Sequence, residues 1–230
     1  MFAIRAQLYD FSCKILRNLF AQITDPPILP PDRFRNAALF ENAWQELATE
    51  ANKLFQEPDA VPSFGDIMPE QEELSSYGNK SWRLFVVKSY GYTVPKARSE
   101  ATQLSALLDK APEVLSAAYS WIPGGKIIPT HAGPFRGVLR YSLGLVVPEG
   151  PGPTQRTTLT VADKEYVLRA GHSILWDDTF PHSVENSTDR PRIVLLLDVK
   201  RDHQPLHLRI TSAIVIFCAG IGSYFTLRPR

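Results

Sequence analysis

Two short segments of the chain hold residues whose types and spacing could do chemistry. They are PTHAGP at residues 129–134 and WDDTFPH at residues 176–182. Each carries one histidine, His131 or His182, in a turn beside an apolar run. A single histidine in such a place is more often a hydrogen-bonded structural residue, but neutral imidazole also binds iron, zinc, copper and nickel. The pair therefore predicts a metal held between strands.

Two arginines near these segments could bind an anion. Arg140 stands in LRYSLGL at residues 139–145, and Arg192 begins RIVLLLD at residues 192–198. A guanidinium in an apolar strand is costly to bury without a partner, and its planar fork matches a carboxylate. We therefore expect an anion beside the metal, with an ordinary salt bridge as the alternative for either arginine.

No carboxylate stands where the common non-haem iron site needs one. That site uses two histidines and one acid, and the acid follows the first histidine by two residues; here that position is Gly133. We expect Gly133 to leave room for a water or chloride on the metal. Gly133→Asp would then hold iron at least as tightly and slow turnover. Surface positions are expected for the remaining histidines, His172, His203 and His207.

The residues around these segments carry a family resemblance. In chain order they are Ser120, PGG at 123–125, HAGP at 131–134, Arg140, WDDTFPH at 176–182, Arg192 and Asp198-Val199. In type and spacing this series resembles the aspartyl/asparaginyl β-hydroxylase family, over about residues 82–202 and most densely over 120–199. The resemblance implies a double-stranded β-helix, or jelly roll. It also implies an oxidoreductase that uses Fe(II), O2 and 2-oxoglutarate to hydroxylate an unactivated carbon.

The resemblance also implies roles for single residues. His131 and His182 would be the iron ligands and catalytic residues, since the family's protein-modifying member also has glycine in place of the acid. Arg192 would bind the distal carboxylate of 2-oxoglutarate, with a hydroxyl from Ser120. Arg140 would bind either the near carboxylate of 2-oxoglutarate or a carboxylate of the substrate. Ser142 would lie near the co-substrate or the prime substrate, where the protein-modifying member has histidine.

Asp177 and Asp178 match the same family, and two roles are open for them. Either could orient His182 through a hydrogen bond, or could cap the turn that precedes this histidine. We expect the turn-capping role for Asp177.

The strand pattern predicts an all-β core with flanking helices, an α+β arrangement of cupin-like type. Short strands separated by turn signals are typical of a sandwich or barrel. They are expected at 81–87, 115–122, 126–129, 137–147, 157–161, 164–168, 173–176, 182–186 and 192–199. Helices are expected at 38–55 and 99–108, with a loop at 61–79. Because most helices precede the strands instead of alternating with them, a doubly wound α/β fold is excluded.

Length and composition suit one domain. The chain has 230 residues, and we expect a helical part at 1–80, a jelly-roll core at 81–202 and an apolar tail at 203–230. A formal net charge of +1 gives no argument for a nucleic-acid partner. The two cysteines, Cys13 and Cys218, form no metal or disulfide pattern, and charges interrupt the start of the chain. A cytoplasmic protein is therefore expected.

Both ends of the chain could touch a membrane. Residues 1–23 repeat apolar side chains at helical spacing, namely Ile4, Leu8, Phe11, Ile15, Leu19 and Ile23. We expect this face to pack on the domain, with a membrane-surface helix as the alternative. Residues 210–227 carry no charge, which predicts a buried helix or, alternatively, a membrane anchor.

Three functions follow from these features. The first is an Fe(II)- and 2-oxoglutarate-dependent dioxygenase that hydroxylates an amino acid, a peptide, a carrier-bound group or a related small molecule. The second is a hydroxylase of lipid acyl chains at a membrane surface. The third is a jelly-roll binding module without catalysis, which the presence of both histidines and Arg192 disfavours.

Overall fold

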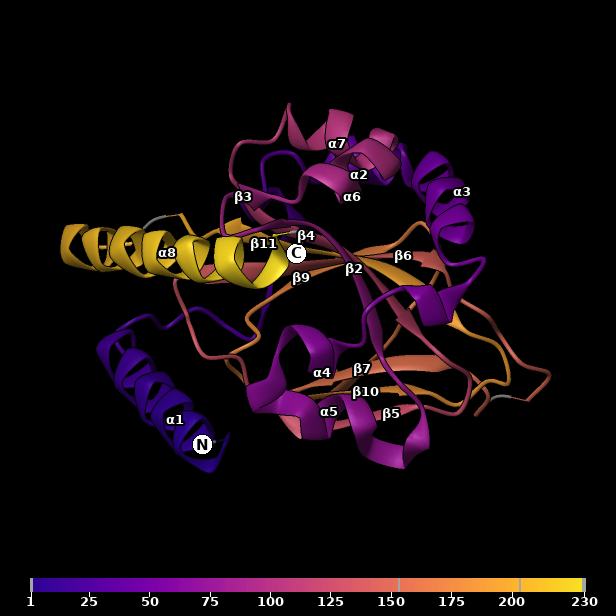
Figure 1. Ribbon diagram of the computed structural model, residues 1–230, viewed down its shortest axis with the longest axis horizontal. Helices are drawn as coiled ribbons and strands as arrows, with labels where there is room; N and C mark the ends of the chain where they lie inside the picture. Colours follow the sequence, from indigo (N-terminus) through magenta and orange to yellow (C-terminus); the bar gives the residue numbers. More distant parts are fainter. Residues whose placement is uncertain (1, 153, 203, 229–230) are drawn as a thin grey trace.

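Two antiparallel sheets face each other at the centre of the protein, and helices cover the outer face of the larger one (Figure 1). The computed structural model describes residues 2–152, 154–202 and 204–228, so His203 lies outside the described residues. The side chains of residues 2–10, 76 and 79 also lie outside the description.

Eight strands form the core in the order that a jelly roll requires. They are β4 (Val114–Ile122), β5 (Ile127–His131), β6 (Val138–Val146), β7 (Thr157–Val161), β8 (Lys164–Val167), β9 (Ser173–Trp176), β10 (His182–Asn186) and β11 (Arg192–Lys200). One sheet contains the series β9-β6-β11-β4, and the other has the order β5-β10-β7-β8. All of these pairs are antiparallel. The predicted double-stranded β-helix is thus confirmed.

Three further strands extend the larger sheet. β1 (Ile28–Leu29) pairs with β9, and β2 (Arg83–Ser89) pairs with β4 and with β3 (Tyr92–Thr93). β2 matches the strand expected at 81–87, whereas β1 and β3 were not predicted. β1 falls within a proline-rich connector, where Pro26 and Pro27 precede it. Prolines are tolerated beside an edge strand because its outer side needs no backbone donor.

Successive side chains along β11 face two different regions. One is the hydrophobic cluster under the helices, and the other is the space between the two sheets. Ile193, Leu195 and Leu197 belong to the hydrophobic cluster under the helices. Their neighbours Val194 and Leu196 belong to clusters between the two sheets. Successive side chains of a strand point to opposite faces, so Arg192 and Asp198 share the inner face with Val194 and Leu196. The same rule places Arg140 and Ser142 together on β6.

Four helices cover the larger sheet: α2 (Ala37–Asn42), α3 (Trp44–Leu54), α6 (Pro95–Glu100) and α7 (Thr102–Leu108). The helix predicted at 38–55 is therefore interrupted at Ala43. The helix predicted at 99–108 begins earlier and is interrupted at Ala101, whose ψ of 66° is not helical. A new helix can begin there because the buried Glu50 carboxylate accepts the backbone N–H groups of Gln103 and Leu104. An acidic group at a helix N-terminus satisfies donors that the helix leaves free.

The loop predicted at 61–79 is instead largely helical. It contains α4 (Phe64–Ile67) and α5 (Glu72–Ser76) together with short 3-10 turns. The Ser63 side chain accepts the backbone N–H of Asp66, whose carboxylate accepts the backbone N–H of Ser63. This capping box is a helix-start signal readable in the sequence.

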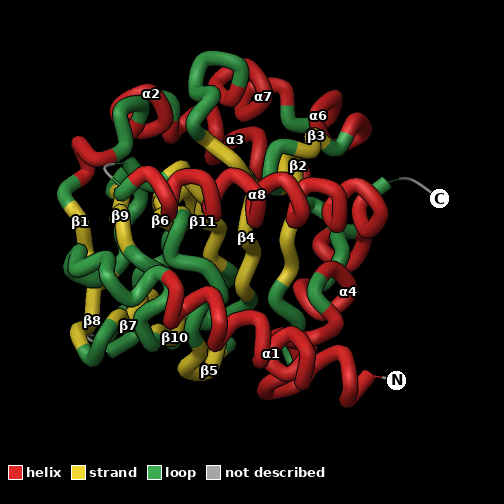
Figure 2. The backbone as a smooth tube through the Cα atoms, turned by 90° about the vertical axis from the view of Figure 1, so that its left-hand side faces the viewer, coloured by secondary structure: helices red, strands yellow, loops and turns green. Residues whose placement is uncertain are grey.

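The helices at the two ends of the chain lie on the same side of the molecule (Figures 1 and 2). In α1 (Phe2–Leu19) the residues Phe11, Ile15 and Leu19 are exposed, while Cys13 is buried. These three members of the stripe expected to pack on the domain thus face outward, whereas Ile23, which follows the helix, is half-buried and packs on the cluster around Phe135. The side chains of Ile4 and Leu8 lie outside the described residues.

α8 (Leu206–Leu227) overturns the prediction of a buried C-terminal helix. Only Leu208 and Ser212 of this helix are buried. A row of large apolar side chains along it is exposed, namely Leu206, Ile210, Ile214, Phe217, Ile221, Tyr224 and Phe225. The helix is long and apolar enough to cross a membrane, with a mean hydropathy of 1.8. The sequence shows that residues 210–227 are uncharged. It does not show which of their side chains the domain covers.

Candidate functional site

The two histidines of the sequence motifs meet at the rim of the smaller sheet. His131 ends β5, His182 begins β10, and the two residues are direct partners across these antiparallel strands. Their ring centroids lie 4.1 Å apart. Residues about fifty positions apart in the sequence are thus brought together by strand pairing, as the jelly-roll topology predicts. His182 is buried and His131 is half-buried.

Both imidazoles are oriented by the backbone carbonyl two residues earlier in the chain. Nδ1 of His131 lies 2.8 Å from the carbonyl oxygen of Pro129, and Nδ1 of His182 lies 2.9 Å from that of Phe180. A carbonyl oxygen only accepts, so in the neutral ring Nδ1 carries the hydrogen and Nε2 keeps its lone pair. Second-sphere carbonyls orient metal-binding histidines in this way. His182 is therefore oriented by backbone carbonyl groups, and not by the side-chain hydrogen bond considered for Asp178.

The surroundings keep both rings in the neutral form that binds metals. Burial, followed by the neighbouring His131, lowers the pKa of His182 to about 3. Burial also lowers the pKa of His131. Since metal ligation requires the unprotonated ring, both Nε2 lone pairs are available at neutral pH.

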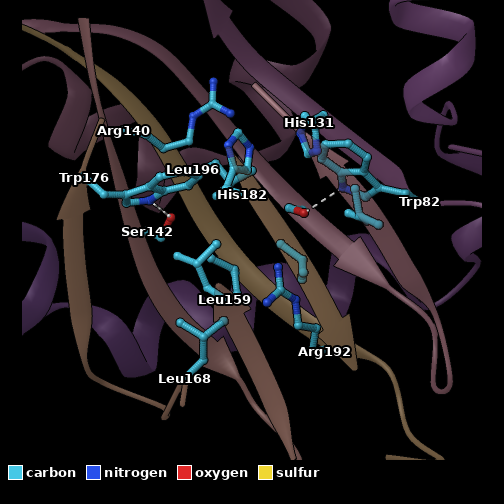
Figure 3. Close-up of a pocket in the computed structure, with 14 residues that line it drawn as sticks. Trp82, His131, Arg140, Ser142, Leu159, Leu168, Trp176, His182, Arg192 and Leu196 are labelled. Atoms are coloured by element: carbon cyan, nitrogen blue, oxygen red, sulfur yellow. Dashed lines mark hydrogen bonds between the residues drawn. The ribbon is translucent and has the colours of Figure 1, made fainter. Parts of the chain in front are cut away.

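Arg192 is a buried cation that lacks protein partners for part of its guanidinium. It is 3% exposed, and its Nε and Nη1 atoms have no hydrogen-bond partner among the described residues. Burial lowers the pKa of Arg192 to about 9, so the group is still charged at neutral pH. In Figure 3 its guanidinium points into the cavity toward the histidines. Buried unpaired charges are rare unless a ligand pairs with them.

Two serine hydroxyls in the same cavity each accept a hydrogen bond from a tryptophan (Figure 3). Nε1 of Trp82 donates to Ser120 Oγ at 2.9 Å, and Nε1 of Trp176 donates to Ser142 Oγ at 3.0 Å. An indole N–H can only donate, so each serine keeps its own O–H for another acceptor. Both serines and Arg192 line this cavity, which we call the core cavity.

The sequence analysis did not identify Trp82 and Trp176 as members of the site. The sequence signal that could have identified these two residues is that a buried indole N–H needs a hydrogen-bond acceptor. Which hydroxyl would accept it depends on strand pairing, which the sequence pattern does not specify.

Arg140, in contrast to Arg192, is paired with two carboxylates. Its Nη2 lies 2.8 Å from Asp198 Oδ1 and 3.2 Å from Asp178 Oδ2. Burial disfavours the charged guanidinium, but the two acids outweigh this effect and raise the pKa of Arg140. Burial raises the pKa of Asp178 to about 6, against the opposite effect of Arg140. Anion binding by Arg140 remains a prediction, and any anion there would meet these acids.

Gly133 does not leave the open space that we expected. A Cβ built on Gly133 would lie 2.4–2.6 Å from the carboxyl atoms of Asp178. The Gly133 N–H also donates to the Asp178 carbonyl oxygen at 2.6 Å. Glycine is therefore needed for this close approach. Gly133→Asp would put a second carboxylate where the first already lies, so tighter iron binding is no longer expected from it.

Asp177 is a structural residue. Its Oδ1 accepts the Thr179 N–H at 3.0 Å, which is the turn-capping role expected for it. Its Oδ2 pairs with Arg136 at 2.8 Å and Arg201 at 2.6 Å, and Arg201 in turn pairs with Asp25. This network ties the chain before β1 to the turn before His182.

The donor set fits a metal held by two protein ligands. Within the part of the chain that the structure describes, no group of three or more His, Cys, Asp or Glu side chains could hold a metal ion. His172 and His207 are exposed, as predicted. His131 and His182 supply two lone pairs, and Arg192 supplies unpartnered donors in the same core cavity. Such a set suits a transition metal with an anionic ligand beside it.

The histidines stand between two cavities. His131, His182, Trp82, Arg140 and Leu196 line the core cavity and also a second one, which we call the front cavity. The front cavity has a volume of about 200 Å³ and includes Gly133 and Asp178 in its wall. A metal on the histidines could thus be approached from Arg192 on one side and from the front cavity on the other.

Comparisons with known proteins identify the family of this chain. The sequence model of a family described as Aspartyl/Asparaginyl beta-hydroxylase matches residues 41–202. An ornithine lipid ester-linked acyl 2-hydroxylase of Rhizobium tropici is 28% identical over 179 residues, 78% of this chain and 62% of that protein. The aspartyl/asparaginyl beta-hydroxylase of Homo sapiens is 28% identical over 140 residues, 59% of this chain and 18% of that protein. The chain thus spans less than two thirds of either relative.

Among solved structures, a prolyl-4-hydroxylase of Pseudomonas putida is similar to this chain. The comparison has a TM-score of 0.45 and 16% identity, and covers 82% of this chain and 99% of that one.

Proposed function

The chain belongs to the aspartyl/asparaginyl beta-hydroxylase family, and from this premise we propose that it is an Fe(II)- and 2-oxoglutarate-dependent hydroxylase. One observation carries the proposal. Arg192 is buried, and its Nε and Nη1 have no hydrogen-bond partner in the described part of the chain; it shares a cavity with two neutral histidines. A pair of structural histidines would not need such an arginine, whereas a dianionic co-substrate beside a metal would.

His131 and His182 would hold the iron through Nε2. Their Nδ1–H groups donate to the carbonyl oxygens of Pro129 and Phe180, which prevents either ring from turning away. When bound, Fe(II) supplies the activation of O2 that couples loss of CO2 from 2-oxoglutarate to hydroxylation of the substrate. In this reaction one oxygen atom of O2 enters a C–H bond as hydroxyl and the other enters succinate, so no further reductant is required.

Arg192 and Ser120 would bind the distal carboxylate of 2-oxoglutarate. The guanidinium provides a planar pair of donors, and a charge-assisted bond to a carboxylate is about twice as strong as a neutral one. Trp82 donates to the Ser120 oxygen, which leaves the serine hydrogen to complete the recognition. Ser142 would act near the other end of the co-substrate, with its oxygen held by Trp176 in the same way.

The front cavity would admit the prime substrate. It lies on the side of the histidines where Arg140, Asp178 and Asp198 line the wall. A free amino acid, a peptide or a carrier-bound group would use Arg140 for a carboxylate. The exposed apolar row on α8 favours the second candidate, a hydroxylase that works at a membrane surface. The similarity to an acyl hydroxylase that acts on a lipid supports the same choice.

The test is a search for the product. The purified protein is incubated with Fe(II), 2-oxoglutarate and either a metabolite extract or a lipid extract, and mass spectrometry records compounds that gain one oxygen. We expect gains only when both Fe(II) and 2-oxoglutarate are present, and in the lipid extract. Gains that persist without 2-oxoglutarate would contradict the proposal.

A further inference from the structure

A third cavity, which is apolar, lies between the two terminal helices and adjoins the front cavity. Leu16 of α1 and Val215 of α8 face it from either side, and Phe135 and Met68 contribute to its wall. Its volume is about 320 Å³, and no charged residue is among the described residues that line it. We call it the lateral cavity. Pockets of this size and apolar character bind small apolar ligands.

The lateral cavity leads toward the histidines. Six residues line both it and the front cavity, namely Ile67, Met68, Ser89, Tyr90, Pro134 and Leu227. The front cavity in turn includes His131 and His182 in its wall. Two adjoining cavities with shared walls therefore extend from between α1 and α8 to the histidine pair.

The surface around the groove between these two helices has the character of a membrane-binding face. Phe11, Ile15 and Leu19 on α1 are exposed, as is the row of apolar side chains on α8, and the two helices cross the same face of the molecule in Figure 2. α8 contains no acidic residue, and Arg209 and Arg228 flank its uncharged stretch. Apolar helix faces with basic neighbours bind anionic lipid surfaces.

The contacts of α8 hold it against the domain near both of its ends. Near its start, Leu208 packs with Phe135 in a buried cluster. Near its end, Ser223 Oγ lies 2.8 Å from Ser89 Oγ, and Tyr224 packs edge-to-face on Tyr92. Because both ends of the helix contact the domain, it cannot stand upright in a bilayer without moving off the sheet. Its outer face can enter the interfacial layer while the domain stays in water.

We propose that the groove between α1 and α8 takes one acyl chain from a membrane lipid and leads it through the lateral and front cavities to the histidines. The lipid headgroup stays outside, so the hydroxyl is placed on the chain. This inference rests on the proposed function for the reaction, but the binding of the chain does not require iron or 2-oxoglutarate.

Gly222 allows a direct test of the route. It lines the lateral cavity, and a Cβ built there would meet nothing within 4 Å. Gly222→Leu therefore adds bulk beside the cavity with no clash at its Cβ, and leucine favours the helix more than glycine does. Gly222→Ala adds only a methyl group. Ala213→Leu is the matched control, because Ala213 is exposed on α8 and does not line the cavity.

The experiment measures binding of 11-(dansylamino)undecanoic acid to the metal-free protein by fluorescence, with circular dichroism as a check on folding. We expect saturable binding to the parent, to Gly222→Ala and to Ala213→Leu, and a loss of at least about tenfold in affinity for Gly222→Leu. Equal affinity of Gly222→Leu and the parent would overturn the proposal. The proposal would also be overturned if the parent bound no probe and a second copy of the chain covered its α1 and α8.

A titration of the same proteins with 2-oxoglutarate and Mn(II) separates this inference from the proposed function. All four proteins should bind 2-oxoglutarate alike, because neither Gly222 nor Ala213 is among the described residues that line the core cavity. Binding of the fatty acid without binding of 2-oxoglutarate would refute the proposed function and leave the route intact. Binding of 2-oxoglutarate without the fatty acid would refute the route alone.

Discussion

At the residue scale, the site differs from its surroundings in how its charges are satisfied. Arg140 and Arg201 each contact two carboxylates, whereas Arg192 keeps unpartnered donors in a buried place. The sequence could predict that Arg192 enters an apolar strand. It could not show that Arg192, and not Arg140, is the arginine left without a protein acid, because that depends on which side chains the strand register places opposite each other.

Arg192→Lys should weaken binding of 2-oxoglutarate by about 2 kcal/mol, or roughly 30-fold, because lysine cannot form the two-donor fork. Calorimetric titration in the presence of Mn(II) measures this change.

Arg192→Met should bind no 2-oxoglutarate and should unfold at higher denaturant concentration than the parent, because it removes a buried charge without a protein partner. An Arg192→Met protein that is less stable than the parent would show that the guanidinium has a structural role.

Trp82→Phe should lower the affinity for 2-oxoglutarate even though the indole does not belong to the predicted anion contacts. Without the Nε1–H donor, the Ser120 hydroxyl is no longer held with its hydrogen free for the ligand. The loss should be about 1 kcal/mol, the net value of a typical hydrogen bond. Because Trp82 acts through Ser120, the effect of Trp82→Phe should largely vanish in a Ser120→Ala background. Full additivity of the two substitutions would contradict this linkage.

Asp178 should make the stability of the metal-free protein depend on pH. Its pKa is about 6 in the folded protein, above the ordinary value of 3.8, so the folded state binds this proton more tightly than the unfolded state. The free energy of unfolding should therefore fall as pH rises from about 4 to about 6. Urea denaturation across this range should show a shallower decline in Asp178→Asn. An unchanged slope would mean that other groups cause the dependence.

At the scale of single elements, the central strands were predictable and the terminal helices were not. β7, β9 and β10 have the bounds expected from the sequence, because turn residues such as Asp163, which has a φ of 64°, separate them clearly. α1 and α8 were recognised as helices, but the faces that they bury were assigned wrongly. A hydrophobic stripe shows that a face avoids water; it does not show whether protein or lipid covers that face.

Replacing Ile214 and Phe217 by serine should reduce membrane binding without changing the site. Both side chains are exposed on α8, by 59% and 69%, so their replacement removes apolar surface from the outer face and leaves the core intact. Sedimentation with vesicles of phosphatidylcholine and phosphatidylglycerol should show a several-fold lower bound fraction. Affinity for 2-oxoglutarate in solution should stay the same. Undiminished binding to the vesicles would place the membrane contact elsewhere.

At the scale of the whole molecule, the jelly roll brings side chains of five strands to one place. β5 and β10 supply the histidines, β4 and β6 supply the serines, and β11 supplies Arg192. The strand spacing predicted a sandwich or barrel, and the family resemblance implied the jelly roll in which strand pairing brings the two histidines together. The tryptophan donors, the Asp178 contact with Gly133 and the cavities could not, because they depend on side-chain positions across strands and on helices whose packing faces the pattern leaves open.

The most direct test of the account is 2-oxoglutarate turnover in three proteins: the parent, His131→Ala and His182→Ala. Release of CO2 from 2-oxoglutarate labelled at its first carbon is followed with and without Fe(II), and bound iron is determined on the same preparations. With only two protein ligands, neither substitution leaves a redundant site. We predict iron-dependent turnover in the parent, and neither turnover nor stoichiometric iron in the two variants. Turnover that survives either substitution would contradict a two-histidine iron site at the junction of β5 and β10.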